Sequence, residues 1–215
     1  MVQRSKVTDL PKVPPYAYFL VSAVFHYLGP AFAVLLFARV GVLGVAWLRI
    51  ASAAVIFAAW RRPWRQFREG NWSQRRLLIE LGIVLGLMNT CFYLAIARLP
   101  LATVGAIEFL GQIILAAIGV RSGRNLLALG LAVAGGALLT DVRLAGQPLG
   151  FVFAFANGAL FMLYVVLGHR IARDGGRAGI DRLGAAMLVA LFAVTPLGLG
   201  AALPSFTNAQ LLLAG

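Results

Sequence analysis

Residues 81–118 read LGIVLGLMNTCFYLAIARLPLATVGAIEFLGQIILAAI, and this stretch decides the fold. It holds the larger part of two long apolar runs that are separated only by a short segment around Arg98. An apolar run of about 20 residues matches the roughly 30 Å hydrocarbon core of a bilayer. Helices are the expected element, because open strands in lipid would leave backbone hydrogen-bonding groups unpaired. The short connection makes the two helices antiparallel neighbours.

The same pattern continues in both directions along the chain. Seven apolar runs occur, at residues 16–37, 42–60, 77–97, 100–120, 125–140, 149–168 and 183–203. The run at 125–140 is at the short end for a membrane span, and residues 209–214 resemble the start of an eighth. We therefore predict an all-α, polytopic transmembrane bundle of about seven spans and the beginning of another.

Composition supports a membrane protein and excludes a nucleic-acid binder. Of the 215 residues, 61% are hydrophobic and 12% are charged, whereas soluble domains average about 45–50% and about 25%. The net charge is +12, but the basic residues lie in loops between apolar runs and form no basic face with interleaved aromatics. The expected partners are the lipid bilayer and a small-molecule substrate, with no nucleic acid; association into a homo-oligomer stays open.

The distribution of arginine and lysine predicts the orientation. Basic residues fill the N-terminal tail, 1–15, and the loops that follow the second, fourth and sixth runs. The opposite loops carry only three arginines, namely Arg39, Arg98 and Arg143. This bias predicts a cytoplasmic N-terminus in a multi-pass protein of the cell inner membrane. Trp60, Trp64 and Trp72 flank the most basic loop, as residues of an interfacial aromatic belt do.

Motifs for enzyme chemistry are missing from the sequence. It has no HExxH, GxSxG or P-loop pattern and no acidic pair at metal-ligand spacing. The two histidines, His26 and His169, are far apart in the sequence, and Cys91 is the only cysteine. The sequence therefore predicts a protein that is not an enzyme, with no catalytic residue, no metal site and no cofactor.

Polar and small residues form stripes on the predicted helices. In the run at 77–97, Gly82, Gly86, Asn89 and Tyr93 are spaced 0, 4, 7 and 11 residues apart, which places them on one helix face. The runs that contain His26, Glu108 and Asn157 carry stripes of the same spacing. Gly82 and Gly86 form a GxxxG pair, which permits a close helix contact. We also expect Gly29-Pro30 to interrupt the first helix in mid-span.

The ionisable residues within the spans are the main candidates for function. A charged group at mid-membrane costs about 2.5–3.5 kcal/mol on insertion scales, so Glu108 needs a partner, a cavity or a role. It either faces a cavity, where it contacts a substrate ammonium or a proton, or it only ties helices together. Arg49 is a basic counterpart that either faces the same cavity or extends to the interface. His26 either titrates near neutral pH or is a hydrogen-bonded packing residue.

The remaining candidates are uncharged polar residues on the same stripes. They either line a pore or form interhelical hydrogen bonds. They are Asn89, Tyr93, Gln112, Asn157 and Tyr164.

One part of the sequence resembles a known family. The stretch 85–96, LGLMNTCFYLAI, is followed by Leu99-Pro100-Leu101-Ala102 and by Ile107-Glu108-Phe109-Leu110-Gly111. This combination resembles the EamA-type transporters of the drug/metabolite transporter superfamily, and among them the threonine/homoserine exporter group. The segment Trp47-Leu48-Arg49-Ile50 and the sixth run, with Gly158-Ala159 and Tyr164, are similar too. The sequence departs from the family pattern at Gln112, where a proline is expected.

The resemblance implies a domain organisation and an activity. EamA-type transporters have two five-helix halves in inverted topology around a central cavity. This implies a tail at 1–15, a first half at 16–146 and an incomplete second half at 147–215. It also implies export of small metabolites such as threonine or homoserine, and Glu108 and His26 suggest proton coupling. The alternative is a truncated, non-transporting membrane protein, or a subunit that needs a partner to complete the bundle.

Overall fold

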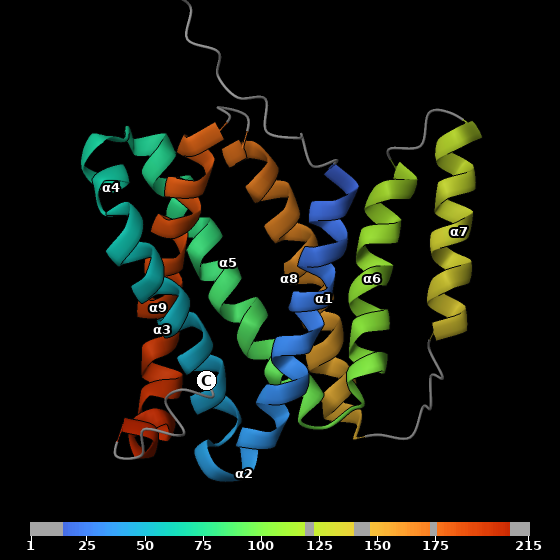
Figure 1. The fold of residues 1–215 in the computed structure, drawn as a ribbon, viewed down its shortest axis with the longest axis horizontal. Helices are drawn as coiled ribbons and strands as arrows, with labels where there is room; N and C mark the ends of the chain where they lie inside the picture. Colours follow the sequence, from blue (N-terminus) through green and yellow to red (C-terminus); the bar gives the residue numbers. More distant parts are fainter. Residues whose placement is uncertain (1–14, 119–122, 140–146, 173–175, 207–215) are drawn as a thin grey trace, which may run out of the picture.

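A computed structural model describes residues 15–118, 123–139, 147–172 and 176–206 of the chain, and these ranges contain helices and no strands. The elements are α1 (Pro15–Ala33), the 3-10 helix η1 (Val34–Leu36), α2 (Phe37–Val40), α3 (Val42–Arg61), α4 (Arg65–Glu69), α5 (Trp72–Ile96), α6 (Leu101–Ile118), α7 (Gly123–Leu139), α8 (Pro148–Ala172) and α9 (Gly176–Phe206). The long helices stand side by side as a bundle (Figure 1). The all-α prediction is confirmed.

Among the described residues, six helical segments are long and apolar enough to cross a membrane. They are Val21–Val40, Val42–Arg61, Trp72–Ile96, Leu101–Ile118, Pro148–Ile171 and Gly179–Leu203. The predicted run at 125–140 does form a helix, α7, but it has 17 residues and is not among these candidate spans. A multi-pass membrane protein is thus supported, whereas a count of seven spans is not confirmed. Residues 209–214, the predicted start of an eighth span, lie outside the described residues.

The first helix is not interrupted where the sequence suggested. Pro30 lies inside α1, which continues to Ala33 and then tightens into η1. A proline removes one backbone donor, but the helix here continues for three residues beyond it. The break comes instead at Gly41, whose φ of 76° is a left-handed value that glycine adopts without a steric penalty. The first span therefore runs through α1, η1 and α2 as one unit, Val21–Val40.

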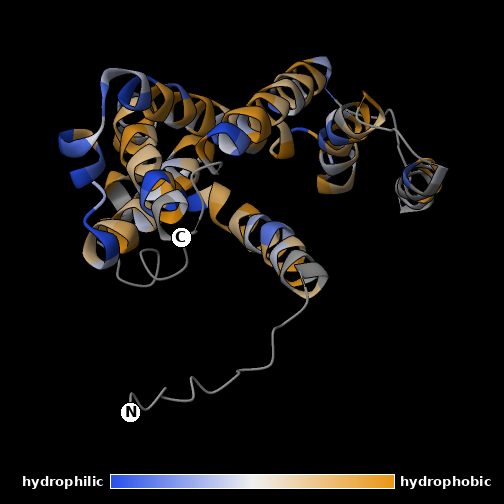
Figure 2. Ribbon diagram, turned by 90° about the horizontal axis from the view of Figure 1, so that it is seen from above, coloured by the Kyte–Doolittle hydropathy of each residue, from blue (hydrophilic) through white to orange (hydrophobic). Residues whose placement is uncertain are grey.

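The most extensive packing joins helices that are distant in the sequence. Helix α3 packs along α9, α5 packs along both α8 and α9, and α6 packs along α8. Chain neighbours such as α5 and α6, in contrast, share only a short contact. In Figures 1 and 2, α7 stands at the edge of the bundle, beyond α6. The helices of the predicted second half are thus packed chiefly against those of the first.

Glycine permits the closest of these helix contacts. A Cβ atom added at Gly82 would lie 2.4 Å from the Cβ of Val189, and one added at Gly198 would lie 2.5 Å from the Cβ of Trp47. Gly86 faces Val194 in the same way. The predicted role of the Gly82/Gly86 pair in a close helix contact is confirmed, because both residues lie against α9.

Three buried apolar clusters pack the described helices. One includes Val40, Val45, Ile96, Leu99 and Val104, near the ends of α2 and α5 and the starts of α3 and α6. Another includes Leu78, Leu81, Leu167, Ile171 and Ala185, at the opposite ends of the helices. The third includes Ile50, Leu85, Ala190 and Val194, in the middle of α3, α5 and α9, and its Ile50 and Leu85 also line the cavity described next.

Candidate functional site

A cavity of about 390 Å³ lies near the middle of the bundle, with walls from α1, α3, α5, α6, α8 and α9. Seven of the eight residues predicted from the sequence line it: His26, Arg49, Asn89, Glu108, Gln112, Asn157 and Tyr164. The eighth, Tyr93, is buried, and its hydroxyl oxygen accepts a hydrogen bond from Arg49. The stripes on separate helices therefore meet at one place.

Glu108 forms the acidic part of the cavity. The residue is only 2% exposed. Asn157 Nδ2 donates to its Oε2 atom at 2.9 Å, and His26 Nε2 lies 3.2 Å from its Oε1 atom. Both carboxylate oxygens thus have a partner from another helix, which is the condition under which a buried carboxylate is tolerated. Since the His26 side chain is 37% exposed, this pair borders the open part of the cavity.

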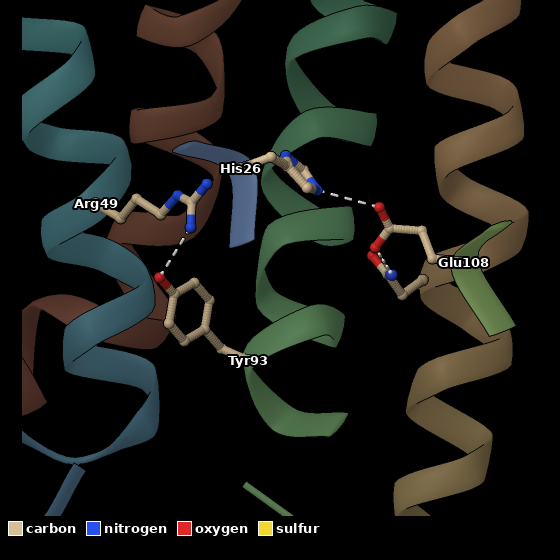
Figure 3. Close-up of polar contacts among 5 residues, drawn as sticks. His26, Arg49, Tyr93 and Glu108 are labelled. Atoms are coloured by element: carbon tan, nitrogen blue, oxygen red, sulfur yellow. Dashed lines mark hydrogen bonds and ion pairs between the residues drawn. The ribbon is translucent and has the colours of Figure 1, made fainter. Parts of the chain in front are cut away.

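Arg49 forms the basic part of the cavity. Its Nη1 atom donates to the Tyr93 hydroxyl at 3.2 Å, and its guanidinium carbon lies 5.9 Å from the centre of the same ring. Figure 3 shows Arg49 with Tyr93 on one side and His26 with Glu108 on the other. Within the described residues, no ion pair joins Arg49 to Glu108, whose carboxylate lies beside His26 instead.

Neighbouring contacts fix the helices that present these groups. Asn89 Nδ2 donates to the backbone carbonyl of Ala46 at 3.0 Å, which ties α5 to α3 one turn before Arg49. Gly158 lies against the carbonyl of Ile107, where an added Cβ would come within 3.3 Å of the oxygen, so that α8 approaches α6 closely beside Glu108. The polar groups are therefore positioned by backbone contacts and not by their own hydrogen bonds alone.

Gln112 and Tyr164 line the cavity without a hydrogen-bond partner among the described residues. Gln112 lies four residues after Glu108, which places it about one helical turn away on the same face. Its amide can both donate and accept. The arrangement leaves uncommitted hydrogen-bonding groups beside the Glu108 carboxylate.

The sequence did not identify the apolar wall of the cavity. Tyr27, Met88, Phe92, Phe109 and Met187 also line it. Phe92 and Met88 are neighbours of the Asn89 stripe, a weak signal that could have included them. Met187 carries no such signal. An apolar side chain on a membrane helix can face lipid, the protein core or a cavity, and its residue type does not distinguish these environments.

The cavity combines features that suit a small amphipathic molecule. Its volume falls within the roughly 300–1,000 Å³ of small-molecule sites, which are mostly apolar with a few placed polar groups. A carboxylate at one side and a guanidinium at the other are complementary to an ammonium and a carboxylate on one ligand. In the described parts of the chain, no three His, Cys, Asp or Glu side chains gather as a metal site.

Comparison with known proteins identifies relatives of one kind. The chain is 33% identical over 178 residues to the threonine/homoserine exporter RhtA of Salmonella typhimurium strain LT2, covering 79% of this chain and 57% of that protein. It is 32% identical over 201 residues to the threonine/homoserine exporter RhtA of Escherichia coli K12, covering 88% and 65%. The chain thus spans less than two thirds of these relatives. No family model and no solved structure matches it.

Proposed function

We propose that the cavity of this chain binds small zwitterionic amino acids such as threonine or homoserine for export. The proposal rests on the similarity of the chain to its homologues, the threonine/homoserine exporters of the drug/metabolite transporter family. The observation that carries the proposal is the presence of two residues of opposite charge in the lining of one cavity, Glu108 on α6 and Arg49 on α3. The relatives are named as exporters and not as enzymes, which supports a transport role for this chain as well.

In this proposal the Glu108 carboxylate binds the substrate ammonium and Arg49 binds the substrate carboxylate. A guanidinium matches a carboxylate in a bidentate geometry, and each such charge-assisted hydrogen bond is about twice as strong as a neutral one. The uncommitted groups of Gln112 and Tyr164 would contact the remaining polar atoms of the substrate. Asn89, Tyr93 and Asn157 hold the charged groups in place.

Proton coupling follows from the same carboxylate. Glu108 would release the substrate ammonium when it accepts a proton from the far side of the membrane, so that one proton enters for each amino acid exported. His26, which lies 3.2 Å from Glu108, would deliver and remove that proton.

The basic loops would lie in the cytoplasm and the protein in the inner membrane, in accordance with the positive-inside rule. Residues 16–146 would form the first half and 147–215 part of the second.

The test is export of labelled threonine from proteoliposomes that contain the chain, with and without a pH gradient. Glu108→Gln removes the carboxylate but keeps its size, and we expect it to abolish the stimulation by the gradient. Glu80→Gln is the matched control, because Glu80 lies outside the cavity and pairs with Arg76. Gradient-dependent export that survives in Glu108→Gln would exclude this coupling mechanism. If the parent chain exports nothing, the alternative of a non-transporting protein or a partnered subunit is favoured.

A further inference from the structure

The loop between α3 and α5, residues 60–76, presents three tryptophans at its surface. Trp60 is 70% exposed, Trp64 is 45% exposed and Trp72 is 77% exposed. Helix α4, which lies within this loop, has no buried residue. The hydrophilic turns at the left edge of Figure 2 correspond to α4 at the left of Figure 1. Tryptophan in membrane proteins prefers the boundary between hydrocarbon and headgroups.

This loop is held in one conformation and attached to α9. Arg61 Nε donates to Asp181 Oδ1 at 2.6 Å, and Pro63 is buried against Gly184, where an added Cβ would lie 3.3 Å from the proline Cβ. Farther along, Arg75 Nε donates to the Gly70 carbonyl at 2.9 Å. Asn71 and Gln74 then form a capping box at the start of α5. The loop is therefore a defined surface.

The charges on the loop divide into paired and unpaired arginines. Arg65 pairs with Glu69 at 3.4 Å and Arg76 pairs with Glu80 at 2.7 Å. Arg62 and Arg68 are exposed, and no acidic side chain lies within ion-pair distance of either among the described residues. The carbonyl of Arg68 accepts a bond from Arg75 Nη2 at 3.3 Å, which fixes its backbone. The loop thus carries three arginines that no carboxylate neutralises among the described residues, and two of them, Arg62 and Arg68, are exposed, whereas Arg75 is half-buried and bonded to backbone carbonyls.

The backbone at Arg62 has a conformation that is uncommon for a residue with a side chain. Its φ of 49° and ψ of 54° are left-handed, and it is the one non-glycine residue with positive φ in the described parts of the chain. Glycine is the residue that helices usually place at such an end, and a residue with a side chain is disfavoured there. Arg62 therefore occupies a backbone position that glycine can take without losing the fold.

We propose that this loop is a binding surface for anionic phospholipid, with the lipid phosphate contacted by Arg62 and Arg68. The tryptophans point to a lipid source and not to a soluble anion, since their indole rings would lie beside the acyl chains of the same lipid. A hollow of about 360 Å³ on the loop surface is lined by Arg65, Arg68 and Glu69. The Glu69 carboxylate in this hollow forms an ion pair with Arg65. Because Arg61 and Pro63 join the loop to α9, a lipid bound here lies at the contact between α3 and α9.

The tryptophans themselves provide the assay. The chain has four, and the fourth, Trp47, donates to Thr195 Oγ1 inside the bundle, so that a Trp47→Phe background leaves only the loop reporters. This protein is placed in phosphatidylcholine vesicles that contain acyl-brominated phosphatidylglycerol or, separately, acyl-brominated phosphatidylcholine. We expect stronger quenching by the anionic lipid, and loss of the difference at high salt, where exposed charges are screened.

Two single variants test the assignment to the unpaired arginines. Arg68→Gln should raise the amount of brominated phosphatidylglycerol needed for half-maximal quenching roughly fivefold, as expected for one basic residue near an anionic surface. Arg39→Gln is the matched control, because Arg39 is also exposed but lies in α2 at the opposite end of the bundle (Figure 1). Arg62→Gly relieves the left-handed backbone and removes the charge, so it should fold normally and lose the same preference.

Three results would overturn the proposal. The first is equal quenching by the two brominated lipids in the Trp47→Phe protein. The second is an effect of Arg39→Gln as large as that of Arg68→Gln, which would indicate a general effect of net charge. The third is loss of the preference on adding inorganic phosphate at constant ionic strength, which would make the loop a site for soluble anions. None of these measurements depends on transport, so the proposed function can fail without affecting this one.

Discussion

Asn157 on α8 donates through Nδ2 to Glu108 Oε2 on α6 at 2.9 Å, and both residues are almost completely buried. This bond joins a helix of the predicted first half to a helix of the predicted second half. A buried carboxylate oxygen that loses its donor costs about 1–3 kcal/mol. The Asn157–Glu108 bond therefore stabilises the bundle and also orients the carboxylate toward the cavity.

Replacing Asn157 with leucine should destabilise the protein. The variant keeps a side chain of similar size but leaves Glu108 Oε2 without its donor, so we expect a loss of about 1–3 kcal/mol in the free energy of unfolding. Thermal unfolding in detergent measures the effect. Ser52→Ala is the control, since Ser52 Oγ donates to the Arg49 carbonyl from an exposed position. Equal stability of Asn157→Leu and the parent would contradict a stabilising role for the bond.

Replacing His26 with glutamine should weaken the stimulation of export by a pH gradient. In the proposed function His26, whose Nε2 atom lies 3.2 Å from Glu108 Oε1, delivers and removes the proton of that carboxylate. Glutamine can still donate a hydrogen bond to Glu108 but cannot carry a proton to it. Export of labelled threonine from proteoliposomes with and without the gradient measures the effect. Stimulation equal to that of the parent would show that another group serves Glu108.

Replacing Arg49 with glutamine should weaken binding of substrates that carry a carboxylate. A hydrogen bond to a charged group contributes about 1.5–3 kcal/mol, or roughly 10-fold to 100-fold in affinity. Competition assays should show this loss for threonine but not for the corresponding amine, which lacks the carboxylate. Tyr93→Phe removes only the hydroxyl that accepts from Arg49, so its effect should be smaller. An equal loss for threonine and the amine would mean that Arg49 acts on cavity structure.

Two glycine-to-alanine changes should have opposite effects on stability. At Gly82 the new Cβ would lie 2.4 Å from Val189 Cβ, and overpacking of this kind costs typically about 1–3 kcal/mol. At Gly168 in α8, no atom lies within 4 Å of an added Cβ, so alanine should stabilise the helix by up to about 1 kcal/mol. Unfolding temperatures compare the two variants directly. A stable Gly82→Ala protein would show that α5 and α9 can separate without cost.

Several features of the site could be predicted from local patterns. Asn89, Glu108 and Asn157 each belong to a stripe with helical spacing, and a polar residue in a membrane helix is expected to avoid lipid. All three line the same cavity. The apolar wall could not be predicted in this way, since Met187 and Phe109 have no property in the sequence that separates a cavity wall from a lipid-facing surface. The helical course through Pro30 was also predicted wrongly, because α1 continues to Ala33 and only then tightens into η1.

The sequence by itself determined that the chain forms apolar helices, where most of them begin and end, and which faces carry polar groups. These properties depend on hydrophobicity and on a period of 3.6 residues, both of which act locally. Only the tertiary structure decided that α3 packs on α9 and α5 on α8, and that Glu108 is paired with His26 and Asn157 while Arg49 is bonded to Tyr93. Which helices pack together depends on how small residues such as Gly82 and Gly198 fit against residues more than 100 positions away in the chain. These contacts form only when the helices assemble, so the local sequence pattern does not reveal them.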